Sequence, residues 1–242
     1  MDALIYTLMS GAERSLRAQQ VHANNLANAD TGGFRADLEL ARSETVTQGY
    51  GYDARHMSRL EANALSTRQG ALRETGRELD VAVVGQGYFA VQTSGGEAYT
   101  RAGAFVIDAD GALTLHGRAV LGDGGPIVLP EHVKLQIGAD GLISILPPGE
   151  RDMQPVDRLK LVNPAADELT KNAEGFIVAR NGEPYAPDDT VRVRSGWLEG
   201  SNVAAVEEMI AVMSLNREFE VQMRMYRAAD SMAEAGNRLV RG

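Results

Sequence analysis

The sequence contains no cysteine among its 242 residues, and this absence excludes disulfide bonds, thiolate nucleophiles and cysteine metal ligands. No apolar run reaches the length of about 20 residues that a membrane-spanning helix needs. Basic residues are also scarce, with 24 Lys and Arg against 33 Asp and Glu, so the formal net charge is −9. Because a chain without a basic surplus displaces few counterions from a phosphate backbone, we expect no nucleic-acid partner.

The N-terminus lacks the pattern of a secretory signal peptide. An acid, Asp2, stands where a basic segment would be, and Ser10, Gly11 and Glu13 interrupt the apolar run that follows. The absence of cysteine suits a protein that folds without disulfides in an oxidising space. If the protein leaves the cytoplasm, we expect export without a cleaved signal peptide.

Motifs that carry chemistry are also missing. The sequence has no phosphate-binding P-loop, no Gly-x-Ser-x-Gly elbow and no His-Glu-x-x-His pair. Gly85-Gln86-Gly87 lacks the third glycine of a dinucleotide loop, and Asp108-Ala109-Asp110-Gly111 places its glycine too early for a calcium loop. The four histidines fall in unrelated segments: His22, His56, His116 and His132. We therefore expect no catalytic residue, no metal ligand and no cofactor.

The longest regular pattern lies in the last forty residues and predicts a long helix. Its first line of positions steps alternately by three and four, the spacing of a helix face that packs along its length. A second apolar line lies on roughly the opposite side, which predicts neighbours on two sides, although a long buried helix in an ordinary α-domain would also fit. The first line is Met209, Val212, Asn216, Phe219, Met223, Tyr226, Asp230, Ala233, Asn237 and Val240; the second is Leu215, Met225, Ala229, Met232 and Leu239.

Residues 1 to about 29 predict another amphipathic helix. Its stripe has one polar exception and consists of Ile5, Met9, Ala12, Leu16, Gln19, Ala23 and Leu26. The helix should end near Asn28, because the Asn, Asp and paired Gly residues that follow favour a turn. Since neither terminal helix has a partner nearby in sequence, we expect them to pack against each other, parallel or antiparallel, as one coiled-coil-like module.

The middle of the chain changes character twice. Residues 35–78 are polar and predict an extended connecting arm, with a disordered linker as the alternative; the spacing around Leu38 to Arg42 allows a weak helix. From 79 onward, short apolar runs alternate with turn dipeptides such as Asp140-Gly141, and the runs on either side of Gly85-Gln86-Gly87 predict a hairpin.

The predicted fold class is therefore α+β, with a mostly antiparallel β-domain inserted between two long terminal helices. Its predicted segments are 1–34 (helix), 35–78 (arm), 79–200 (β-domain) and 201–242 (helix).

Five blocks in one order resemble the bacterial flagellar rod and hook proteins over nearly the full length of the chain. Any single block could arise by coincidence, but the ordered set argues for the family. The first block comprises Asn25, Leu26, Ala27, Asn28, Thr31, Gly33, Phe34 and Arg35. The central blocks are Thr75-Gly76 with Leu79-Asp80-Val81-Ala82, Gly85-Gln86-Gly87-Tyr88-Phe89, and the run from Tyr99 to Phe105. The last comprises Leu198, Glu199, Gly200, Ser201, Asn202 and Val203.

Within this family, the sequence looks most like the proximal-rod members. Three segments carry that likeness: the opening Met1 to Thr7, the loop Gly122 to Ile127, and Asp157 to Val162. Distal-rod members are the alternative, because they share several of the blocks. One departure is Phe219, where relatives often carry Tyr.

The resemblance implies a non-enzymatic structural subunit of the periplasmic rod of the basal body. Such proteins pass unfolded through the flagellar export apparatus and polymerise, with copies of themselves and neighbouring rod proteins, into a hollow shaft whose inner tube their terminal helices line. The side chains expected at subunit interfaces and in helix packing are Ile5, Met9, Leu16, Leu26, Met209, Val212, Phe219, Met223, Met225, Tyr226 and Met232. The rival class is a ligand-binding or enzymatic β-domain with helical oligomerisation arms, which would need titratable groups that converge in the β-domain.

Overall fold

Two long helices and a β-rich middle make up the described chain. The computed structural model describes residues 2–45, 56–172 and 174–241, and their side chains over 7–38, 64–172 and 174–239. The chain divides into two units, called here the helical unit (Met1–Ala27, Asp37–Asn63 and Ala204–Gly242) and the β-unit (Asn28–Ala36 and Ala64–Val203). The predicted arm, residues 35–78, thus contributes to both units.

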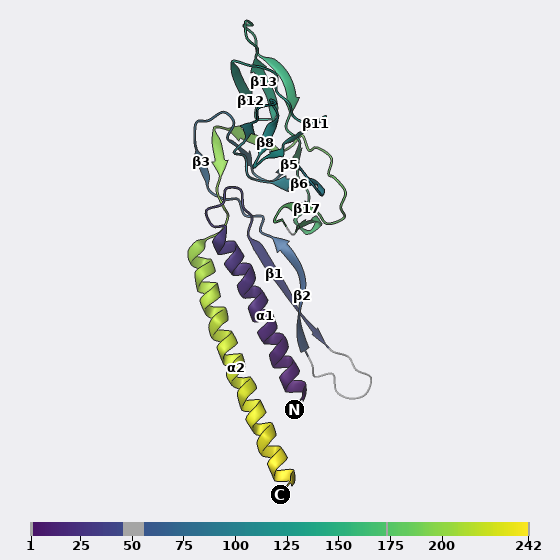
Figure 1. Ribbon diagram of the computed structural model, residues 1–242, viewed down its shortest axis with the longest axis vertical. Helices are drawn as coiled ribbons and strands as arrows, with labels where there is room; N and C mark the ends of the chain where they lie inside the picture. The colour runs from purple at the N-terminus through teal and green to yellow at the C-terminus, as the bar shows by residue number, and fades with distance from the viewer. Residues whose placement is uncertain (1, 46–55, 173, 242) are drawn as a thin grey trace. The chain divides into compact units, whose positions relative to one another are not determined.

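In the helical unit, α1 (Asp2–Ala27) and α2 (Ala205–Arg241) lie side by side (Figure 1). Polar contacts connect them, since Gln19 Nε2 donates to Asn216 Oδ1 at 2.9 Å, and His22 Nδ1 lies 2.5 Å from Glu208 Oε2. Because later positions of α1 match earlier positions of α2, the pair is antiparallel. The prediction that the terminal helices pack together is confirmed.

The helix boundaries follow from local chemistry. α1 ends at Ala27, close to the predicted Asn28, and Thr31 N then donates to Asn28 O at 3.1 Å in a tight turn. At its start, α2 carries Glu207 and Glu208 in the first turn, where negative charge interacts favourably with the helix dipole. With 37 residues, α2 is about 55 Å long.

A two-stranded sheet of β1 (Asp37–Thr45) and β2 (His56–Leu65) accompanies the helices, and β1 contacts α1. The weak helix expected around Leu38 to Arg42 is therefore wrong. The sequence from Asp37 alternates polar and apolar residues, and this period of two favours a strand once a partner strand supplies hydrogen bonds.

The β-unit is built of short strands, and every strand pair with a described register is antiparallel. This confirms the predicted β-rich, mostly antiparallel middle. Its largest sheet has the order β15-β5-β6-β17-β16. The strands of that sheet are β5 (Tyr88–Thr93), β6 (Gly96–Thr100), β15 (Leu161–Val162), β16 (Leu169–Lys171) and β17 (Ile177–Ala179).

The remaining strands form small sheets around it. β4 (Val81–Val84) pairs with β18 (Arg192–Ser195), and β3 (Leu72–Glu74) pairs with β19 (Trp197–Glu199). The other small sheets comprise β7 (Val106–Ile107), β8 (Leu113–Leu115) and β9 (Arg118–Ala119); β10 (Leu121–Gly122) and β11 (Gly125–Pro126); and β12 (Lys134–Ile137), β13 (Leu142–Leu146) and β14 (Gln154–Arg158). A single turn of 3₁₀ helix covers Ala166–Glu168.

The hairpin predicted around Gly85-Gln86-Gly87 is wrong. The turn exists, with φ of +78° at Gly85 and +124° at Gly87, but β4 and β5 pair with other strands. A Cβ at Gly87 would lie 2.7 Å from Val191, so the turn directs β5 past a packed neighbour rather than back along β4. The Asp140-Gly141 turn, in contrast, joins the paired strands β12 and β13 as predicted.

The core of the β-unit holds fully buried aromatic and aliphatic side chains. Phe89 and Phe105 contact edge to face, with ring centroids 5.2 Å apart. Around them lie the buried side chains of Val81, Val83, Val91, Leu113, Ile127, Ile143, Ile145 and Leu159. The β-unit therefore buries a continuous apolar core of its own.

Candidate functional site: the exposed face of α2 and the motif segments

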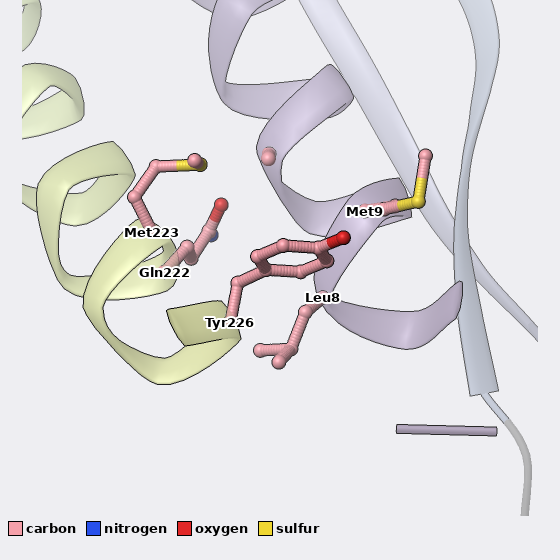
Figure 2. A pocket seen from close by; sticks show the side chains of 6 residues that line it. Leu8, Met9, Gln222, Met223 and Tyr226 are labelled. Carbon is pink, nitrogen blue, oxygen red and sulfur yellow. The ribbon is translucent and has the colours of Figure 1, made fainter. Parts of the chain in front are cut away.

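The side of α2 that faces α1 carries the predicted first line. Phe219, Met223 and Tyr226 are half-buried there, as is Val212. Figure 2 shows Gln222, Met223 and Tyr226 directed from α2 toward α1. Together with Leu8, Met9 and Ala12 of α1 they line a small, mostly apolar cavity of about 160 Å³. One side of α2 is thus covered by its own chain.

The opposite side of α2 carries an apolar stripe that no described segment of the helical unit covers. Its large side chains follow a spacing of three and four residues, or multiples of it, and each exposes between 49% and 85% of its surface. These residues, called here the exposed stripe, are Val206, Ile210, Met213, Val221, Met225, Met232 and Leu239. Single exposed apolar residues are ordinary, but a stripe along a whole helix indicates a docking surface.

The exposed stripe overlaps only partly with the predicted second line. Met225, Met232 and Leu239 lie on it, whereas Ala229 is buried and Leu215 half-buried. Sequence reasoning missed its earlier members because the second line was started at Leu215. The same three-and-four spacing counted from Val206 would have found them.

The other predicted interface residues occupy different environments. Met9 and Leu16 of α1 are exposed, with 57% and 46% of their surface accessible, and Leu26 is half-buried. Met209 is 48% exposed and lies between the two faces of α2. The side chain of Ile5 lies outside the described residues.

In the β-unit, the first and last motif blocks meet. Residues 28–36 follow α1, residues 198–203 precede α2, and their backbones are hydrogen-bonded. Gly33 N donates to Glu199 O at 2.8 Å and Asn202 N donates to Phe34 O at 3.2 Å. The side chain of Asn202 extends this contact, because its Oδ1 accepts from Ala36 N at 2.7 Å.

The carboxylate of Glu199 is at the centre of this meeting point. Its Oε1 accepts from Gly70 N at 2.8 Å and lies 2.9 Å from Arg35 Nη2, while Oε2 accepts from Arg101 Nη1 at 3.0 Å. All three charged side chains are at least 97% buried. Burial lowers the pKa of Arg101, and the neighbouring Glu199 opposes that shift.

Further bonds hold the two guanidinium groups in place. Arg101 Nη2 donates to Gly85 O at 2.6 Å, and Arg35 Nη1 donates to Arg68 O. Gly33 is required beside them, because its φ is +70° and a Cβ there would lie 2.1 Å from Ala102 N. The motif residues thus define a turn and its attachment rather than a reactive site.

The other members of the motif also act in turns and packing. Thr31 Oγ1 donates to Asn28 Oδ1 at 3.1 Å, and the ring of Phe34 lies 3.9 Å from Lys171 Nζ. Ser201 Oγ accepts from Val203 N at 3.2 Å just before α2 begins. Leu198 and Leu26 are half-buried, and Ala27 is the last residue of α1.

The β-unit has a groove of about 630 Å³. If the protein were a ligand-binding or enzymatic β-domain, its reactive groups would be expected there. Residues 29–32, 102–104 and 198–201 line it, together with Ala71, Arg73 and His116. Within the described part of the chain, no three His, Asp or Glu side chains gather as a metal site would require, and no helix is long and apolar enough to cross a membrane.

The described chain thus combines an antiparallel helix pair from its two ends, a β-rich unit between them in sequence, and a turn motif next to both helices. Comparisons with protein families agree along the chain. Residues 5–35 match the family "Flagella basal body rod protein", 82–145 match "Flagellar hook protein FlgE/F/G D1 domain", and 194–239 match "Flagellar basal body rod FlgEFG protein C-terminal".

The chain belongs to the flagellar basal-body rod protein family. It is 40% identical to the flagellar basal-body rod protein FlgF of Escherichia coli (strain K12) over 99% of both chains, and 39% identical to FlgF of Salmonella typhimurium over 99% of both. FlgF of Caulobacter vibrioides is 32% identical over 93% of this chain and 92% of its own. A relative named FlgG, from Buchnera aphidicola, is 29% identical. The predicted family, and the likeness to its FlgF members, is confirmed.

Proposed function

We propose that this chain is a structural, non-enzymatic subunit of the flagellar basal-body rod, in its proximal part, and that it polymerises through its terminal helices. Its partners are copies of itself and neighbouring rod proteins. The observation that carries this proposal is the exposed stripe of α2, since α1 covers one side of that helix and no described segment covers the other.

The geometry of the stripe favours a contact with another subunit. From Val206 to Leu239 it extends over about 50 Å at 1.5 Å per residue. Burying such a surface is favourable by roughly 25 cal/mol for each Å² of apolar area. The stripe is one face of the helix pair, and the side of α1 that exposes Met9 and Leu16 is another. A contact between two such different faces is heterologous, and contacts of this kind continue into helical assemblies unless the ring closes.

The same surface accounts for the route to the rod. A chain whose ends expose apolar stripes gains order when neighbours cover them, so we propose that the terminal helices are poorly ordered in the free monomer and fold on assembly. Such a chain would pass through the flagellar export apparatus unfolded and without a cleaved signal peptide, and would assemble in the periplasm. The terminal helices would then line the inner tube of the rod.

One substitution with a matched control tests the proposal. Val221→Asp places a charge in the middle of the exposed stripe, and Val133→Asp makes the same change at a residue of the β-unit that is 71% exposed. Each variant is produced in a strain that lacks its own copy, and basal bodies are purified and probed for the subunit. Val221→Asp should be absent from the rod and non-motile, and Val133→Asp should be present. Normal incorporation of Val221→Asp would refute the proposal.

A further inference from the structure

We propose that Glu199, Arg35 and Arg101 form a positioning device, called here the Glu199 bracket. It fixes the segment that follows α1 and the segment that precedes α2 in one arrangement. Residues 28–36 and 198–203 are those segments. The bracket is not an interface, because its three side chains are buried in the β-unit. Assembly nevertheless depends on it. The inference rests on the proposed function. It adds that assembly requires the Glu199 bracket as well as the exposed stripe.

Three separate parts of the chain converge on one carboxylate. Arg35 belongs to the segment after α1, Glu199 to the segment before α2, and Arg101 follows β6 in the body of the β-unit. Gly70 N supplies the third contact to the Glu199 carboxylate, from a different segment, at 2.8 Å. Because a carboxylate has two oxygens in a fixed plane, this set of contacts fixes both segments against the same strands.

The charged contacts specify the geometry of the two segments more than they stabilise the fold. Two guanidinium groups share one carboxylate, and among the described residues Arg35 Nε and Arg101 Nε have no hydrogen-bond partner. A buried ion pair is often no more stable than apolar side chains of similar volume, because its desolvation is costly. Such a cluster is best explained as a means to specify one geometry, which apolar packing would leave open.

The fixed geometry matters for the helices because α1 ends and α2 begins within a few residues of it. α1 ends at Ala27, and α2 begins at Ala205. When the two attachment segments are held together, pairing the helices becomes a local event with a high effective concentration. When the two segments are released from each other, pairing α1 with α2 costs more conformational entropy. The exposed stripe then no longer lies on a paired helix.

Glu199→Gln tests the bracket with the full-length chain. The glutamine keeps the size and one acceptor, but its NH₂ group meets the donors of Arg101. Hydrogen exchange should become at least about tenfold faster in residues 28–36 and 64–70, whereas exchange in β13 should stay unchanged. Incorporation into basal bodies should fall by at least about tenfold. An exchange rate that stays at the wild-type level in 28–36, or rises equally in β13, would overturn the inference. So would normal incorporation.

A triple variant separates positioning from stability. Arg35→Met, Glu199→Leu and Arg101→Met together fill the volume without charge, so the unfolding temperature should return toward that of the wild type. Exchange in 28–36 should stay fast and incorporation low, because the directional bonds are missing. Normal incorporation of this variant would overturn the inference. If Glu199→Gln fails to fold, Arg101→Lys, which keeps the charge and loses the bond to Gly85 O, is judged by the same measurements.

Val221→Asp distinguishes the inference from the proposed function. It should lose incorporation with wild-type exchange in 28–36, because the bracket is intact. If Val221→Asp enters the rod normally, the proposed function fails. If Glu199→Gln alone enters normally, only the inference fails.

Discussion

The side-chain amide of Asn25 binds both main-chain groups of Asp37: its Nδ2 donates to Asp37 O at 3.0 Å, and its Oδ1 accepts from Asp37 N at 2.9 Å. Asn25 is 99% buried, and the contact ties the last turn of α1 to the start of β1 within the helical unit. A motif residue that precedes a turn therefore has a second role, which is to fix a strand on the helix.

Asn25→Asp should destabilise the helical unit by roughly 1–3 kcal/mol, because the aspartate cannot donate to Asp37 O and so loses one of the two buried hydrogen bonds that Asn25 makes to Asp37. Because these helices are proposed to be poorly ordered in the free monomer, the measurement is made on rods assembled from the purified chain. Their helix content is followed against urea concentration by circular dichroism in the far ultraviolet. Asn237→Asp makes the same change at an exposed position of α2 and should shift the unfolding curve little. Equal shifts for both variants would contradict this role.

Gly33→Ala should destabilise the β-unit strongly. The alanine must adopt a φ of +70°, which costs roughly 1–2 kcal/mol, and its Cβ would also collide with the backbone of Ala102. Gly182→Ala is the matched control, because Gly182 has a φ of +75° and open space around its Cβ position. Thermal unfolding should show a larger loss for Gly33→Ala, and the difference measures the cost of the collision.

Met223→Asp should prevent incorporation into the rod while the β-unit stays folded. The side chain lies on the α1 side of α2, where an unpaired charge would lose water without gaining a partner. Met223→Leu keeps an apolar side chain of similar volume and should incorporate. The readouts are motility and the near-ultraviolet circular dichroism of the purified chain; normal motility of Met223→Asp would show that this face is dispensable.

Asp80 should make the β-unit sensitive to acid. Burial alone would raise the pKa of Asp80, but hydrogen bonds from Arg77 and Thr75 outweigh it and hold that pKa below its ordinary value of 3.8. A depressed folded-state pKa contributes stability that is present above the unfolded value and is lost as the pH falls through the folded value. Between about pH 5 and pH 3 the wild type should therefore lose more unfolding free energy than Asp80→Asn. Parallel losses would contradict this.

Sequence reasoning located what depends on local periodicity. The two terminal helices, the end of α1 near Asn28 and the Asp140-Gly141 turn all follow from spacing and turn chemistry that lie within a few residues. The hairpin around Gly85 was wrong because strand partners are chosen by the whole core: β4 finds β18 more than a hundred residues later. The strand at Leu38 was missed for the same reason, since its pairing with β2 lies outside any local window.

For the candidate site too, sequence reasoning found the local patterns and missed the contacts between distant segments. The motif blocks were found, but nothing in their spacing revealed that Glu199 would meet Arg35 and Arg101, because that contact joins segments separated by about a hundred residues or more. The inward line of α2 was identified by its period. The exposed stripe was only half identified, because a long helix offers several apolar lines and only the position of α1 decides which one stays open.

The unequal lengths of the two helices have a consequence of their own. α2 has 37 residues and α1 has 26, so even a perfectly aligned pair leaves α2 longer by 11 residues, or about 16 Å. About three turns of α2 are thus available for an overlap between subunits, in which the end of α2 that extends beyond α1 packs along the next subunit instead of meeting it end to end. A shaft built of such overlaps would resist both bending and twisting at its seams.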